Sequence, residues 1–150
     1  MSLGLATFAV VVFATFFNNA LHFYTQAQTY PLFGWVDRQG FVSFRKEYQR
    51  RLPLAIYAPY TLLMAANALL LFFRPAEVAV GWVVVLLIFN ASIVVERLAL
   101  AAPIHYRMDR QTRNDKGEVR RLIWLNGARL AAATASSFVV VYLLVRTLVP

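Results

Sequence analysis

The chain has 150 residues, 60% of them hydrophobic and 15% charged, and its mean hydropathy is +0.57. Soluble domains are usually nearer half apolar, so this composition indicates an integral membrane protein. The net charge of +8 comes without an RNA- or DNA-binding motif, which excludes nucleic acid as an expected partner, and the lack of cysteine excludes disulfides and thiolate metal sites.

Four apolar stretches are each long enough to cross a bilayer, which takes about 20 residues of helix. We expect the spans at about residues 3–24, 52–73, 78–102 and 122–148, with the third span stopped or kinked at Pro103. Backbone amides in lipid must bond within their own segment, so the spans are predicted to be helices. The fold class is therefore all-α, an antiparallel four-helix membrane bundle in one domain, residues 1–150. The N-terminus lacks the features of a cleaved signal peptide, so the first span is expected to be retained.

The positions of lysine and arginine predict how the bundle is oriented. The loop after the first span carries five of them: Arg38, Arg45, Lys46, Arg50 and Arg51. The loop after the third span carries six: Arg107, Arg110, Arg113, Lys116, Arg120 and Arg121. The opposite side carries Arg74 and Arg146. The positive-inside rule then places both long loops in the cytoplasm and both termini outside.

Residues 39–51 of the first long loop are predicted to form an amphipathic helix. Its apolar side recurs at three- and four-residue spacing, at Phe41, Phe44, Tyr48 and Leu52. The basic side is expected to contact anionic lipid at the membrane surface, through Arg45, Lys46, Arg50 and Arg51. A lid over a cytoplasm-facing site is the alternative interpretation. In the second long loop we expect a solvated turn at Asn114–Gly117.

Polar residues gather near one depth, toward the cytoplasmic ends of the spans: Asn18, Asn19, His22, Glu96, His105, Asn126 and Arg129. Glu96 and Arg129 each lie about 10 Å inside a span at ~1.5 Å rise per residue. A carboxylate and a guanidinium at one level in lipid are best accommodated as a pair. We therefore predict a Glu96–Arg129 ion pair, with Asn126 one turn nearer the cytoplasm. The pair either orders the bundle or belongs to a binding or proton-handling site, and neighbouring Arg97 is expected to reach lipid phosphates.

The sequence leaves cofactors and ligands open. His22 and His105 could ligate a haem iron, or a metal together with Glu96, but their spacing matches no metal motif, and bonds to backbone or lipid are the alternative. The phenylalanines of the first span either face lipid or form a slot for a quinone, pigment or polyketide. Trp35, Trp82 and Trp124 are expected at the membrane interfaces. A stripe of small residues, Ala128, Ala132 and Ser136, favours close helix packing within the chain or against a partner.

Several short motifs carry a resemblance to a known family. They are Thr29–Phe33 (TYPLF), Phe41-x-x-Phe44-x-x-x-Tyr48-x-x-Arg51, Pro103-Ile104-His105 and Asn126-x-x-Arg129. Together they resemble small bacterial four-span proteins of unknown function, similar in layout to the anthrone oxygenase-like family. The resemblance implies a bacterial inner-membrane location, lipophilic phenolic substrates and site roles for His105, Asn126 and Arg129. Many members carry histidine where this chain has Thr29 and Arg45. The resemblance therefore supports the fold and the location of the site better than it supports oxygenase chemistry.

Two functional hypotheses remain. The first is a non-catalytic accessory or structural subunit, packed against a larger membrane complex or a second copy of itself. It fits the absence of a nucleophile triad or a phosphate-binding loop from the sequence. The alternative is a membrane oxidoreductase or oxygenase that acts on a lipophilic substrate near the cytoplasmic face. A transporter is less favoured, because four spans are few and no internal repeat is evident.

Overall fold

The computed structural model describes residues 2–37, 39–111 and 115–148. Helix accounts for 87% of the described residues, which contain no strand. The expectations for Arg38, Arg113 and Asn114 lie outside the described residues. The all-α prediction is confirmed.

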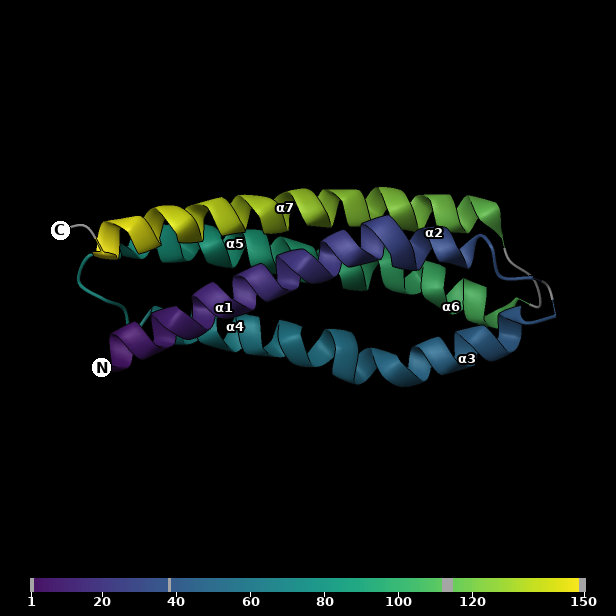
Figure 1. Ribbon diagram of the computed structural model, residues 1–150, viewed down its shortest axis with the longest axis horizontal. Helices are drawn as coiled ribbons and strands as arrows, with labels where there is room; N and C mark the ends of the chain where they lie inside the picture. The colour runs from purple at the N-terminus through teal and green to yellow at the C-terminus, as the bar shows by residue number, and fades with distance from the viewer. Residues whose placement is uncertain (1, 38, 112–114, 149–150) are drawn as a thin grey trace.

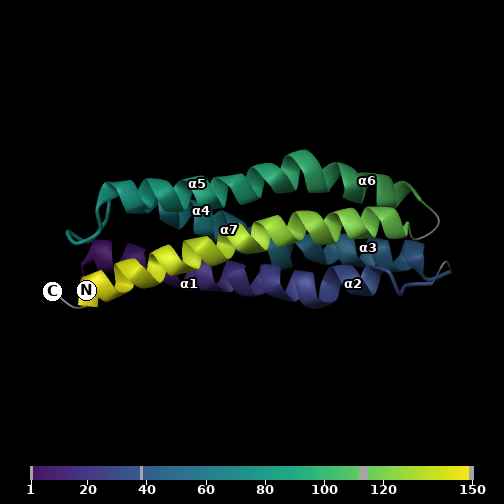
Figure 2. The same ribbon diagram turned by 90° about the horizontal axis from the view of Figure 1, so that it is seen from above.

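Four long helices lie side by side along one axis, and successive helices run in opposite directions (Figure 1). In chain order the elements are α1 (Leu3–Tyr24), η1 (Thr25–Thr29), α2 (Tyr30–Phe33), α3 (Phe41–Leu52), η2 (Pro53–Tyr57), α4 (Ala58–Leu70), α5 (Val80–Glu96), η3 (Arg97–Ala101), α6 (Ala102–Arg110) and α7 (Lys116–Leu148). Both termini lie at one end of the molecule, opposite α2, α3 and α6 (Figure 2).

The helices are long and apolar enough to cross a membrane: Leu3–Phe33, Phe41–Leu70, Val80–Arg110 and Lys116–Leu148. Each overlaps one of the predicted spans, so the prediction of four long apolar helices is confirmed. At ~1.5 Å per residue each is about 45–50 Å long, well beyond the ~30 Å of a hydrocarbon core. One end of the helices would therefore extend past the acyl chains.

Prolines explain why three of the long helices contain a π-helical segment. The segments η1, η2 and η3 end two residues before Pro31, Pro59 and Pro103, respectively. A proline ring clashes with the carbonyl four residues earlier and offers no N–H. The wider i→i+5 turn of a π segment relieves that clash without ending the helix. Of the two outcomes expected at Pro103, a stop or a kink, the stop is wrong, because the helix continues through η3 into α6. α7 has no proline and no such segment.

The core consists of two apolar clusters separated by a polar layer. The cluster near the termini contains Phe8, Val11, Ala66, Leu70, Val78, Val83, Leu86, Val140 and Leu143. The cluster at the other end contains Tyr30, Phe33, Phe41, Ala101, Ile104, Met108, Val119 and Leu122. Between them lie buried polar side chains that include His22, Arg97, Asn126 and Arg129. A buried polar layer costs stability unless its groups are paired, so its contacts are informative about function.

The amphipathic helix expected at residues 39–51 forms as α3, but it packs on its own chain. Phe41 is buried in the second apolar cluster, and Phe44 and Tyr48 pack against it. The rings of Phe44 and Tyr48 both contact the Phe33 ring of α2 edge to face. The apolar side of α3 is thus covered by protein, as a lid would be.

Candidate functional site

A small polar chamber of about 20 Å³ is enclosed between the two apolar clusters. This volume holds about one water molecule. All four long helices line it, through Leu21, His22, Thr25, Tyr30, Tyr48, Ile56, Tyr60, Arg97, Asn126 and Arg129. Each π segment supplies one lining residue, namely Thr25, Ile56 or Arg97. The prolines that cause the π segments therefore also shape the chamber.

The lining is positively charged. It contains the two guanidiniums of Arg97 and Arg129, three tyrosine phenols and one imidazole, and the described lining residues include no carboxylate. Apolar clusters close both ends of this layer, so the two charges are poorly hydrated. A chamber with this lining favours an anion or a polarised oxygen.

Arg97 is a buried cation whose partners are all neutral. The residue is 9% exposed. Its Nη1 lies 3.0 Å from His105 Nε2 and donates to the Tyr30 hydroxyl at 3.3 Å; the Tyr57 hydroxyl is a further neighbour. None of the carboxylates in the described part of the chain lies within ion-pair distance of it. The expectation that Arg97 reaches lipid phosphates is wrong, because η3 turns the side chain inward.

His105 links Arg97 of the chamber wall to α3. Arg45 of α3 contacts His105 Nδ1 through both terminal nitrogens at 3.3 Å and donates to the His105 carbonyl. The same guanidinium forms an ion pair with Asp109 at 2.6 Å. A neutral imidazole has one acceptor nitrogen, so His105 satisfies either Arg45 or Arg97, but not both. Arg45 is also paired with the Asp109 carboxylate, whereas Arg97 has no carboxylate partner among the described residues.

Arg45 was expected to contact lipid together with the other basic residues of α3, and this expectation is wrong. Its side chain is 3% exposed, and its guanidinium lies over the rings of Phe33 and Tyr48. Lys46, Arg50 and Arg51 are exposed, as expected. Arg50 and Arg51 pair with Glu47 at 2.7 and 2.6 Å. Position 45 differs because it lies on the apolar side of α3, next to Phe41 and Tyr48.

His22 and Asn126 form a second hydrogen-bonded group on the chamber wall. The Asn126 amide donates to the His22 carbonyl at 3.0 Å and to Gln26 Oε1 at 2.9 Å. Asn126 Oδ1 must then accept from His22 Nδ1, 3.2 Å away, which places the ring proton on that nitrogen. Nε2 is left to accept from the Tyr60 hydroxyl, its contact on α4. These bonds connect α1, α4 and α7 at one level.

The predicted Glu96–Arg129 pair is confirmed. Glu96 Oε2 and Arg129 Nε are 2.6 Å apart, and the side chains are 16% and 4% exposed. The N–H is not directed at the oxygen, and neither Glu96 oxygen has a hydrogen bond. Arg129 Nη2 is also buried without a hydrogen-bond partner. The contact is therefore an ion pair with unused donors and acceptors. Asn126 does not join it and bonds to His22 instead.

Asn18 and Asn19 are not part of the chamber. Asn18 donates to the carbonyls of Ala14 and Pro59, which ties α1 to α4. Asn19 donates to Ser137 and accepts from Thr134, which ties α1 to α7. Both side chains therefore hold helices together rather than face a ligand.

The two histidines do not fit the haem or metal hypothesis. Each of their ring nitrogens faces a side-chain partner: Asn126 and Tyr60 for His22, and Arg45, Arg97 and Tyr30 for His105. Guanidinium donors around His105 repel a cation. A search of the described residues for three or more His, Cys, Asp or Glu side chains gathered as metal ligands finds none.

Sequence reasoning missed several chamber residues. Tyr48 was placed on the apolar side of the amphipathic helix, Tyr30 entered only as part of a motif, and Tyr60 was not considered, yet all three line the chamber. Tyr30 and Tyr60 stand next to Pro31 and Pro59, and this was the available signal, because proline distorts a helix and π bulges are frequent at functional sites. Comparisons with protein-family models, with curated proteins and with solved structures found no match. Function therefore has to be inferred from the geometry of the chamber.

Proposed function

We propose that this chain is a multi-pass protein of the bacterial inner membrane that binds the oxygen-bearing head of a lipophilic phenol or quinone. The long loops would be cytoplasmic and the termini outside, as the basic residues predict. The chamber would then lie near the cytoplasmic face. The observation that carries the proposal is Arg97, a guanidinium buried in the chamber wall without a carboxylate partner among the described residues.

Burying a charge in an apolar region is costly unless a group of opposite charge compensates it. Arg129 has Glu96 and Arg45 has Asp109, but Arg97 has phenol and imidazole contacts alone. A phenolate or a quinone carbonyl placed beside Arg97 would supply the missing acceptor. Charge-assisted hydrogen bonds of this kind are short and strong.

The aromatic lining favours a ring-bearing ligand. Tyr30, Tyr48 and Tyr60 surround a space that accommodates one oxygen-sized group. A carboxylate head would also compensate the charge, but phenol rings in the wall pack best against another ring. The ligand class is therefore a phenol or quinone whose oxygen enters the chamber, whose ring edge meets the tyrosine rings at the entrance and whose tail stays outside.

A depression on the surface of α5 and α7 provides a route from the bilayer. Its volume is about 230 Å³, and Ser92, Ile93, Ala128 and Ala132 line it together with Glu96 and Arg129. Arg129 also lines the chamber, so its side chain forms the wall between the two cavities. Rotation of Arg129 away from Glu96 would connect them. The small residues at this position leave space for an aromatic ring.

The proposal is tested by binding of decyl-ubiquinone and its quinol to the purified protein in nanodiscs, measured by calorimetry. The variant Arg97→Gln should bind at least about tenfold more weakly, a difference of ~1.4 kcal/mol. Its thermal stability should not fall, because an uncompensated buried charge has been removed. The matched control is Arg50→Gln, which makes the same change at an exposed site and should bind as the wild type does.

Two results would overturn the proposal. One is wild-type protein that binds neither form of the probe. The other is Arg97→Gln protein that is folded and binds as tightly as wild type. The variant Ala132→Trp provides an independent check, because a large ring in the surface depression should block entry while the chamber stays intact.

An accessory subunit is the second candidate, and the same depression favours it. Ala128 and Ala132 allow close approach of a helix from another membrane protein. In that case mild-detergent extraction from native membranes would yield a larger assembly, and Ala132→Trp would release the chain from it. A monodisperse protomer that binds the probe would count against this candidate.

A further inference from the structure

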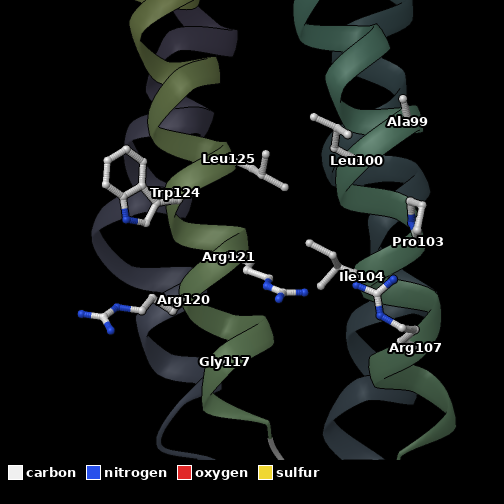
Figure 3. A pocket seen from close by; sticks show the side chains of 10 residues that line it. All are labelled: Ala99, Leu100, Pro103, Ile104, Arg107, Gly117, Arg120, Arg121, Trp124 and Leu125. Carbon is white, nitrogen blue, oxygen red and sulfur yellow. The ribbon is translucent and has the colours of Figure 1, made fainter.

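A separate groove of about 700 Å³ lies between α7 and the segment formed by η3 and α6 (Figure 3). It is far larger than the chamber and opens to the surface of the molecule. None of its lining residues also lines the chamber. The groove is therefore a second site, and it rests on the proposed membrane placement but not on the proposed ligand of the chamber.

The groove follows from the π segment of the third long helix. α5 packs closely along α7, whereas η3 and α6 make few contacts with it. The change occurs where η3 accommodates Pro103, which itself lines the groove. In Figure 2 the chain from α5 to α6 arches away from α7 at this level.

The chemistry of the groove changes along its length. Leu100, Ile104 and Leu125 extend from the two walls into the space between them (Figure 3). Arg107 and Arg121 line it nearer the loop that connects α6 to α7. Leu100 and Arg107 are seven residues apart on one wall, which is about 10 Å along a helix. The interfacial layer on each side of a bilayer is roughly 5–8 Å thick, so this length spans the change from acyl chain to phosphate.

The charged end carries surplus positive charge. Glu118 of α7 bonds Arg107 at 2.8 and 3.2 Å, and it lies 3.9 Å from Arg121. Two guanidiniums thus share one carboxylate. Figure 3 shows Arg107 and Arg121 directed toward each other across the gap, while Arg120 points away from it. One further negative charge between Arg107 and Arg121 would balance this end.

We propose that this groove binds an anionic phospholipid of the cytoplasmic leaflet. The phosphate lies between Arg107 and Arg121, and one acyl chain follows Leu100, Ile104 and Leu125. An apolar wall joined to a guanidinium pair matches such a lipid at both ends. A free phosphate would leave the apolar wall without a function. A second copy of this chain would bring its own basic surface against these arginines.

The test is native mass spectrometry of the full chain, released from vesicles of equal phosphatidylglycerol and phosphatidylcholine. Wild-type protein should retain phosphatidylglycerol in preference to phosphatidylcholine. The variant Arg107→Gln/Arg121→Gln should lose this preference, with at least a fivefold fall in retained phosphatidylglycerol. The control Arg50→Gln/Arg51→Gln removes the same charge from the exposed side of α3 and should retain the lipid.

A second variant separates the acyl chain from the phosphate. Ala99→Trp places a ring on the apolar wall without changing charge, and it should also reduce retained phosphatidylglycerol. Equal loss in the two arginine double variants would overturn the proposal, because general surface charge would then explain the binding. Displacement of the lipid by millimolar inorganic phosphate, or a protein dimer that dissociates in the groove variants, would overturn it too. Arg97→Gln protein should retain the lipid as the wild type does. Failure of the chamber proposal can therefore be distinguished from failure of the groove proposal.

Discussion

Arg97 Nη1 lies 3.0 Å from His105 Nε2, although eight residues separate them on one continuous helix. In a regular α-helix two such Cα atoms are about 12 Å apart along the axis. The long guanidinium side chain extends along the helix to close that distance, and Arg97 is the first residue of η3. The pair therefore links the π segment to His105, and through His105 to Arg45 of α3.

The Glu96–Arg129 pair predicts opposite effects for single and double substitutions. Glu96→Ala leaves the Arg129 guanidinium buried without a carboxylate and should destabilise the protein by about 3–5 kcal/mol. Replacing both residues, Glu96→Leu with Arg129→Met, should restore most of that stability, because apolar pairs of similar volume substitute well for buried ion pairs. Thermal unfolding in detergent micelles, followed by tryptophan fluorescence, measures both. A double variant as unstable as Glu96→Ala would show that the unpaired Arg129 charge is not what destabilises the single variant.

Two buried asparagines should respond in opposite ways to the same substitution. Asn126 makes three side-chain hydrogen bonds, to His22 twice and to Gln26. Asn126→Leu leaves these partners unsatisfied and should cost about 2–3 kcal/mol. Asn67 donates to the Leu63 carbonyl, but its buried Oδ1 has no hydrogen-bond partner. Asn67→Leu should therefore be neutral or stabilising. The same unfolding assay compares them, and a loss of stability in both would argue against this difference.

The positions of the polar residues along the helix axis could be predicted from the sequence, but their directions could not. Glu96 and Arg129 were matched by depth, which depends on a nearly constant rise per residue. Arg97 was assigned to the lipid face by assuming about 100° of rotation per residue. That assumption fails because η3 begins at Arg97, and a π segment turns less per residue. Arg45 was assigned to lipid as one of the basic residues of the amphipathic helix, and the sequence did not show that Asp109 of α6 lies beside it.

The proline origin of the π segments predicts that Pro103→Ala alters the rotation of α6. Without the ring, η3 can return to α-helical geometry, which rotates α6 relative to α5 and turns Asp109 away from α3. Gln49 and Asp109, which share a 2.8 Å hydrogen bond, report this change. The chain has no native cysteine, so Gln49→Cys with Asp109→Cys can be cross-linked cleanly by a short thiol-specific reagent. Both cysteine substitutions remove the Asp109 contacts with Arg45 and Gln49 in either background, so the two backgrounds are compared with each other. Cross-linking seen in the Pro103 background should fall severalfold in Pro103→Ala. Unchanged efficiency would show that the π segment does not depend on Pro103.

Asp109 should control how firmly α3 stays packed against α6. Its carboxylate holds Arg45 at 2.6 Å and Gln49 at 2.8 Å, and these contacts join α3 to α6. Asp109→Asn removes the charge that compensates buried Arg45, so α3 should separate more often from the chamber. Hydrogen exchange read by mass spectrometry should then accelerate in residues 41–52, while α1 and α7 remain protected. The matched control is Glu47→Gln, which removes a carboxylate from the exposed ion pairs with Arg50 and Arg51 and should leave the exchange of α3 unchanged. Equal acceleration in both variants would mean that local helix charge, rather than the buried Arg45–Asp109 contact, sets the stability of α3.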